Sequence, residues 1–265
     1  MQMLPKVQNG KFALTRLIAV VLFIAVLASV ALVRPSIGAD QPQVWPTVQL
    51  PADAESIGIS DRMLANGVPM RTSSFAAKGD VATAVAWFKA RLGSPLTEDR
   101  LGNKTILGRP EGNYYITIQL EPIDTGVLGL IGVSDMRYAL TQQSRSHDAK
   151  DAWIRDLPSG TKVLNLLVSQ DDGKSSTYLL ASNQQSDSLN AERATRALER
   201  RGFAVERRVN LEKGATVNGS VITVSGRAVL FKSADREATL MAFHDESGKA
   251  AVVINTVVLT GGRAP

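Results

Sequence analysis

Apolar and polar side chains follow two different rhythms along most of the chain, with turn residues between the stretches. Alternation with a period of two predicts strands, whereas an apolar residue at every third or fourth position predicts an amphipathic helix. Strand-like stretches outnumber helical ones after residue 44. The pattern therefore predicts an α+β fold made mainly of antiparallel sheet.

Two parts of the chain repeat one order of elements. Each part opens on a tryptophan that is followed by Leu-Pro, at 45–51 in the first copy and at 153–158 in the second. The glycine of a turn dipeptide follows 16 residues after the first proline and 15 after the second, in Asn66-Gly67 and Asp172-Gly173. Both residues of such a dipeptide tolerate positive φ, as a tight turn requires, so each copy is predicted to begin with a β-hairpin.

One covering helix is expected after each hairpin. In the first copy Asp80 can accept a hydrogen bond at the helix start and Gly93 ends the helix. In the second copy Asp187 or Ser188 begins the helix and Gly202 ends it. The positions expected to face the sheet are Val81, Ala84, Val85, Phe88 and Leu92 in the first helix and Ala191, Ala194 and Leu198 in the second.

Further strands complete each copy. They are expected at 104–107, 114–120 and 127–133 in the first copy and at 204–209, 221–224, 228–232, 238–243 and 250–258 in the second. The chain is thus predicted to form two tandem units, 45–136 and 153–260, with a polar linker at 137–152 and a tail at 261–265. Chance recurrence of a common arrangement is the alternative to duplication. The matched tryptophan and Leu-Pro openings favour duplication, because a hairpin requires neither.

The most apolar stretch of the chain is Leu17–Val33, in which Ser29 is the only polar residue and which has an arginine at each end. As a helix its 17 residues would reach about 25 Å, close to the shortest length that spans a bilayer. Because cationic residues precede the stretch, residues 1–16 are expected to stay in the cytoplasm. We therefore expect a single-pass protein of a bacterial inner membrane, with a tether at 34–44 and its body in the periplasm.

A cleaved signal peptide is the alternative to this signal anchor. Small residues suited to cleavage occur at Ser29-Val30-Ala31 and at Ile37-Gly38-Ala39. The apolar stretch is longer than the usual core of a signal peptide, and neither cleavage site is ideal. These two features favour the anchor, whereas cleavage would give a secreted or periplasmic protein.

The charge of the chain comes mainly from its N-terminal end. The whole chain has 30 basic and 25 acidic residues, and residues 1–39 contain four of the basic and none of the acidic ones. The body is left with 26 basic residues against 25 acidic ones. Such a balance gives no electrostatic case for a nucleic-acid partner. The absence of cysteine excludes disulfides, thiolate metal sites and a cysteine nucleophile.

No residue pattern along the chain matches a catalytic or metal-binding motif. The only histidines, His147 and His244, have no further ligands at zinc-site spacing. Ser134 lacks the second glycine of a nucleophile elbow, and the aspartates before Gly173 lack the closing glutamate of a calcium loop. We therefore expect no catalytic residues, no bound metal and no cofactor.

The remaining candidates are residues that could dock a partner. The opening tryptophans, Trp45 and Trp153, either pack over their own unit or form an exposed recognition surface. The densest basic cluster forms either a solvated face bridged to interleaved glutamates or a docking patch for an acidic partner or for lipid headgroups. It includes Arg207, Arg208 and the arginines of the second predicted helix, which are the docking candidates. These arginines are Arg193, Arg196, Arg200 and Arg201.

Taken together, these features predict a non-enzymatic scaffold or adaptor that is tethered to the membrane and lies in the periplasm. Duplicated α+β units on one N-terminal anchor are common in secretion, pilus and envelope machines, which makes other envelope proteins the expected partners. Two alternatives are a periplasmic enzyme acting on cell-wall or lipid substrates and a secreted ligand-binding protein. The sequence leaves the assembly state open.

Overall fold

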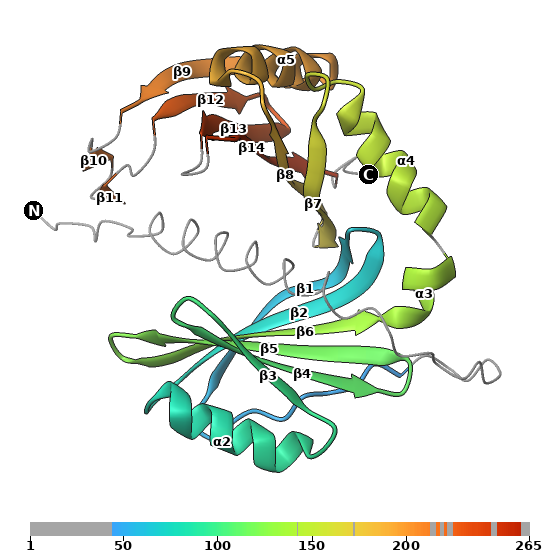
Figure 1. Cartoon of the computed structure of the whole chain (residues 1–265), viewed down its shortest axis with the longest axis vertical. Helices are drawn as coiled ribbons and strands as arrows, with labels where there is room; N and C mark the ends of the chain where they lie inside the picture. Colours follow the sequence, from blue (N-terminus) through green and yellow to red (C-terminus); the bar gives the residue numbers. More distant parts are fainter. Residues whose placement is uncertain are drawn as a thin grey trace, which may run out of the picture. The chain divides into compact units, whose positions relative to one another are not determined.

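The computed structural model describes residues 44–141, 143–171, 173–212, 216–217, 220–221, 225–244 and 248–260. It is dominated by antiparallel sheet with few helices, which confirms the predicted α+β class (Figure 1). The predicted membrane segment, Leu17–Val33, lies outside the described residues. The chain divides into two compact units, and each is described by itself below.

The first unit consists of residues up to Ile59 and of Thr72–Val133. Its strand order is β3-β4-β5-β6-β2-β1, and α2 covers one face of this sheet (Figure 1). The elements are β1 (Glu55–Ala65), β2 (Val68–Ala77), α2 (Val81–Leu92), β3 (Thr97–Leu101), β4 (Lys104–Glu111), β5 (Tyr114–Ile123) and β6 (Gly126–Asp135).

The second unit consists of Ser134 onward together with Ser60–Arg71. Its strand order is β9-β12-β13-β14-β8-β7, and α5 covers one face (Figure 1). Its elements are α3 (Met136–Thr141), α4 (Gln143–Ile154), β7 (Lys162–Asp171), β8 (Lys174–Asn183), α5 (Asp187–Arg200), β9 (Val205–Leu211), β12 (Gly226–Lys232), β13 (Arg236–His244) and β14 (Ala250–Leu259). The short strands β10 (Thr216–Val217) and β11 (Ser220–Val221) pair only with each other.

Both units have the same topology. Read from the outer edge, each sheet places its third, fourth, fifth, sixth, second and first strand in that order, with the helix between the second and third strands in sequence. Among the described elements, the β10–β11 pair, inserted between β9 and β12, and the helices α3 and α4 have no counterpart in the first unit. A shared order of six strands and a helix is the arrangement expected of a duplicated unit.

The core of the first unit lies between α2 and the sheet. Asp80 caps the helix by accepting a hydrogen bond from the Thr83 N–H at 2.7 Å, and Gly93 ends it at a φ of 66°. Phe88 is fully buried and its ring centroid lies 5.6 Å from that of Phe75. These positions agree with the sequence prediction for the helix and its buried face.

A glycine of β6 makes room for this aromatic pair. A Cβ atom at Gly129 would lie 2.0 Å from the ring of Phe75. A side chain at this position would therefore displace the phenylalanine from the core. The absence of a side chain at 129 allows β6 to approach the aromatic layer beneath it.

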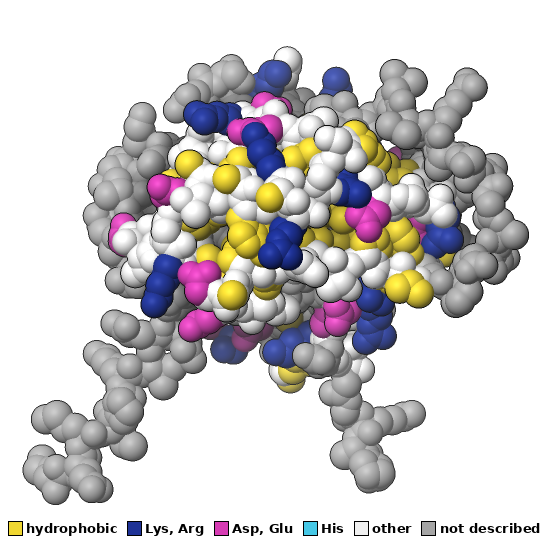
Figure 2. Space-filling model, turned by 90° about the horizontal axis from the view of Figure 1, so that it is seen from below, with side chains coloured by type: hydrophobic (Ala, Val, Ile, Leu, Met, Phe, Trp, Pro, Cys, Tyr) yellow, Lys and Arg dark blue, Asp and Glu magenta, His cyan; other side chains and the backbone are white. Residues whose placement is uncertain are grey.

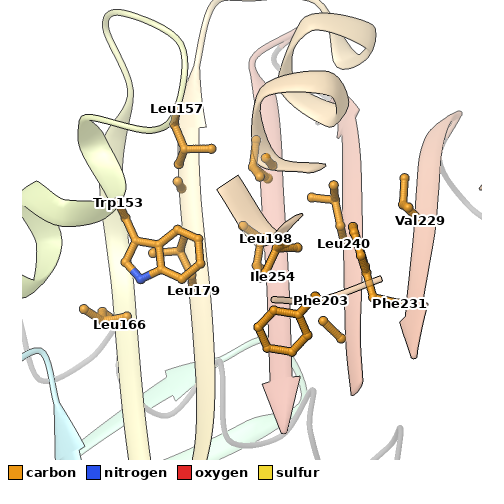
Figure 3. Close-up of a cluster of buried hydrophobic side chains, with 14 residues drawn as sticks. Trp153, Leu157, Leu166, Leu179, Leu198, Phe203, Val229, Phe231, Leu240 and Ile254 are labelled. Atoms are coloured by element: carbon orange, nitrogen blue, oxygen red, sulfur yellow. The ribbon is translucent and has the colours of Figure 1, made fainter. Parts of the chain in front are cut away.

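The core of the second unit combines small side chains of α5 with large ones from other elements (Figure 3). Leu198 is fully buried, as are Ala194 and Ala197 on the same helix. The large side chains around them include Trp153, Phe203 and Phe231. The predicted cap is wrong by one or two positions, because Ser186 accepts the hydrogen bond from the Leu189 N–H and Asp187 is the first helical residue.

The stretch 137–152, predicted as a polar linker, is almost entirely helical and forms α3 and α4. It contains neither glycine nor proline, so nothing in the backbone opposes a helix. A helix that is exposed on most of its surface is polar, so the polar composition of this linker is compatible with a helix. Trp153, which opens the second copy, lies at the end of α4.

The tip of the first hairpin belongs to the second unit. Asn66 and Gly67 have φ angles of 51° and 86°, as the predicted turn requires. Residues 63–65 of β1 pair antiparallel with 167–169 of β7. The Asn66 N–H donates to the Leu166 carbonyl oxygen at 2.8 Å, and the Leu166 N–H donates to Asn66 Oδ1 at 3.0 Å. The sequence prediction had placed the whole hairpin in the first unit.

We expect Phe88→Ala and Leu198→Ala each to lower the free energy of unfolding by about 2–5 kcal/mol, because each leaves a cavity among fully buried neighbours. Thermal unfolding of the full-length protein in detergent measures this change. Arg193→Ala, at an exposed position of α5, should stay within about 0.5 kcal/mol of the wild type. A neutral Leu198→Ala would show that the packing of α5 on its sheet is described incorrectly.

Candidate docking site

The two opening tryptophans pack against their own units. Trp45 is half-buried, and its ring centroid lies 5.1 Å from that of Tyr114. Trp153 is 8% exposed and belongs to the core of the second unit (Figure 3). Packing over the unit was one of the two alternatives for these residues. The docking role predicted for them stays a prediction.

Trp153 lies beside the end of α5, where two of the predicted arginines meet one carboxylate. The Arg201 guanidinium lies over the Trp153 ring, 4.1 Å from its centroid. Arg201 and Arg200 both form ion pairs with Asp156, at 2.7 and 2.5 Å. Arg201 also donates a hydrogen bond to the Ala197 carbonyl oxygen at 2.8 Å. These contacts tie the end of α5 to the turn after α4, so Arg200 and Arg201 are engaged within their own unit.

The Asp156 carboxylate responds to this environment. Partial burial opposes its ionisation, but hydrogen bonds and positive charge from Arg201 and Arg200 outweigh the burial and hold the pKa of Asp156 below its ordinary value of 3.8. The carboxylate is therefore charged at neutral pH. Its single negative charge is shared by both guanidinium groups at this end of α5.

The other two predicted arginines, Arg193 and Arg196, are exposed on α5. Arg196 forms an ion pair with Glu192 at 2.5 Å, one helical turn away. The expected glutamate-bridged face therefore exists at this position. Arg196 also borders a groove, whereas Arg193 has no ion pair among the described residues.

The groove lies between α5 and the strands β9 and β12 and has a volume of about 330 Å³. Arg208 of β9 and Arg227 of β12 join Arg196 at its walls. Arg227 lies 3.8 Å from Asp187, whereas Arg208 has no ion pair in the described part of the chain. Thr195 also lines the groove, and its buried Oγ1 has no hydrogen-bond partner among the residues that the structure describes. The sequence placed Arg208 in the same basic cluster as Arg196, but it gave no signal for Arg227, because only the fold brings β12 beside α5.

The first unit has a groove at the equivalent place, between α2 and the strands β3 and β4. Its volume is about 650 Å³, and Val81 and Val85 contribute apolar surface to it. Lys89 and Glu98 form an ion pair at 2.5 Å across it, and Arg100 lies beside them. A groove that combines a helix flank with charged side chains of an edge strand therefore occurs in both units.

The candidates for catalysis do not come together. His244 is exposed at the end of β13, and Ser134 is 2% exposed within β6. The side chain of His147 lies outside the described residues. Within the described ranges, no group of three or more histidine, aspartate or glutamate residues could hold a metal ion.

The visible surface carries charges of both signs. Figure 2 shows basic and acidic side chains intermingled with apolar ones over the described part of one face. That face offers no broad patch of one sign of the kind that tracks a phosphate backbone.

No family model matches the chain, and a search of the curated proteins finds no match. Among the helices of the described residues, none is long and apolar enough to cross a membrane.

We expect the stability that Asp156 contributes to depend on pH. Because its folded pKa is lowered, this contribution is fully present above the ordinary value of 3.8 and is lost as the pH falls through the folded pKa. Asp156→Asn should cost about 1 kcal/mol at neutral pH, and the difference from wild type should vanish under strongly acidic conditions. Thermal unfolding as a function of pH measures it, with Asp124→Asn at an exposed turn as control. A difference that is constant across this pH range would contradict the assignment.

Proposed function

We propose that the protein is a membrane-tethered periplasmic scaffold or adaptor of an envelope, secretion or pilus assembly and does not act as an enzyme. The observation that carries this proposal is the recurrence of one groove at the same place in two units of the same topology. A repeated surface suits a protein that presents binding sites. An enzyme needs one constellation of reactive groups instead.

The chemistry of the grooves supports a protein partner. The second-unit groove has three arginines and two glutamates on its walls, the glutamates being Glu192 and Glu199. Interleaved charges of both signs favour a partner whose own charges are complementary, because each mismatch would leave a charge unpaired. Arg196 already forms an ion pair with Glu192 on this wall, through side chains that are both exposed.

An enzyme acting on cell-wall sugars is a weaker candidate for the larger groove of the first unit. Such an enzyme needs a carboxyl group with a raised pKa as its general acid. Asp80 lines this groove, but hydrogen bonds from Thr83 lower the pKa of its carboxyl group. Glu98 is ion-paired with Lys89. Both carboxyl groups are thus engaged with partners inside the unit.

The anchor is the second part of the proposal. The apolar stretch Leu17–Val33, with cationic residues before it, supports an N-terminus in the cytoplasm and a body in the periplasm. Envelope proteins are the partners that such a location makes accessible.

We expect a photoreactive amino acid at Arg196 or Arg227, on the walls of the second-unit groove, to crosslink the full-length protein to a defined envelope protein in living cells. The same substitution at Arg155, an exposed position outside the groove, is the matched control. A periplasm-dependent reporter fused after Pro265 should be active in the same cells. Equal adducts at all three positions would refute the docking site, and an active cytoplasmic reporter would refute the topology.

A further inference from the structure

Each unit has one outer strand that pairs on one side only. In the described part of the chain, β3 pairs with β4 and ends the sheet of the first unit, and β9 pairs with β12 and ends that of the second. All five residues of β3 are exposed. The outer backbone N–H and C=O groups of such a strand are a template for an added strand.

The two outer strands have complementary sequences when they are read in opposite directions. An antiparallel register that places Asp99 opposite Arg207 also places Glu98 opposite Arg208 and Arg100 opposite Glu206. The uncharged residues then meet at both ends, Thr97 with Val209 and Leu101 with Val205. Opposite charges directly across an antiparallel pair stabilise it, and like charges destabilise it. This register contains three pairs of opposite sign and none of like sign.

The side-chain directions agree with the same register. Glu98 pairs with Leu107 and Arg208 pairs with Val229, and both of these partners face the helix-covered core of their unit. Glu98 and Arg208 therefore both point to the helix side of their sheets. Asp99 is the neighbour of Glu98 on β3, and Arg207 is the neighbour of Arg208 on β9. Side chains alternate along a strand, so Asp99 and Arg207 both point to the face without the helix. The third pair, Arg100 with Glu206, lies at a bulge of β9. Leu230 of β12 pairs with Arg207 and Phe231 pairs with Val205, so Glu206 is the extra residue of the bulge.

The charges of β9 are available for such a pairing. Glu206, Arg207 and Arg208 are exposed and form no side-chain hydrogen bond or ion pair with other described residues. On β3, Asp99 contacts only the N–H of the next residue, at 2.7 Å. Glu98 is ion-paired with Lys89 through side chains that are both partly exposed, so it can exchange partners at little cost.

We propose that β3 of one copy of this chain pairs antiparallel with β9 of a second copy in this register, so that copies associate head to tail. The occupant of each edge is a second copy because the complementary strand is in the same sequence. Pairing β3 with another β3 in the register that joins Glu98 to Arg100 would place Asp99 opposite itself. The contact is heterologous, so it leaves a free β3 at one end and a free β9 at the other, and association continues into a ring or a fibre.

The second unit already contains an example of such strand addition. The tip of the β1–β2 hairpin pairs with β7, which would otherwise be an exposed strand of that unit. The proposal concerns different strands and holds wherever the protein is located. It shares Glu98, Arg100 and Arg208 with the walls of the two grooves, but its tests use the purified protein without an envelope partner, so its failure and that of the proposed function are distinguishable.

Charge reversal tests the pairing in the purified full-length protein in detergent. Sedimentation at low ionic strength should show that E98K/D99K and R207E/R208E each weaken self-association by about tenfold or more, because each places like charges opposite each other. An equimolar mixture of the two variants should associate again, since each supplies the edge that complements the other. K78E/R155E, which reverses two exposed basic residues outside both edges and both grooves, should associate like the wild type.

Cysteine pairs test the register, since the chain has no cysteine of its own. Thr97→Cys and Val209→Cys, made in separate chains and mixed under oxidising conditions, should form a disulfide-linked dimer, because directly opposed residues have a Cα separation suited to a disulfide. Thr97→Cys mixed with Asn210→Cys, which is one position out of register, should give much less. A monomeric wild type, a mixture of charge variants that stays dissociated, or equal crosslinking of both cysteine mixtures would overturn the proposal.

Discussion

The second unit depends on hydrogen bonds that the tip of the β1–β2 hairpin makes with β7. Without this tip, β7 would end its sheet with unpaired backbone groups, which is an aggregation risk. Side chains reinforce the backbone pairing at both ends, where Asn66 binds the backbone of Leu166 and Ser60 donates to Asp171 at 2.5 Å. The hairpin therefore has two roles, because its base belongs to the sheet of the first unit and its tip completes the sheet of the second.

The helix packs on its sheet through different side chains in the two units. In the first unit, α2 carries the large Phe88, and Gly129 of the sheet makes room for the aromatic layer. In the second unit, α5 presents mostly alanines, and Trp153 and Phe203 supply the bulk from outside the helix. The two units therefore share a strand order but fill their cores with different residues. This is expected when the total volume of the core matters more than the identity of each residue.

The sequence correctly predicted the features that depend on neighbouring residues, namely helix ends and buried helix positions. Asp80 and Gly93 bound α2 as expected, and the periodicity correctly placed Phe88 and Leu198 in the core. The hairpin tip belongs to the second unit because it pairs with residues about a hundred positions away in sequence, as in the Asn66–Leu166 bond. Hydrophobic alternation within a strand shows which face is buried, but it does not show which strand lies beside it. Arg227 of the groove was missed for the same reason, because only strand order brings β12 beside α5.

The central claim of this account is that the hairpin tip is an integral strand of the second unit. Amide hydrogen exchange of the full-length protein tests it at Asn66 and Leu166, whose N–H groups donate to each other's residue at 2.8 and 3.0 Å. The account predicts that both amides exchange as slowly as those in the centre of β8, because they open only when the sheet opens. Exchange at Asn66 as fast as that of an exposed turn, with Leu166 unprotected, would contradict it.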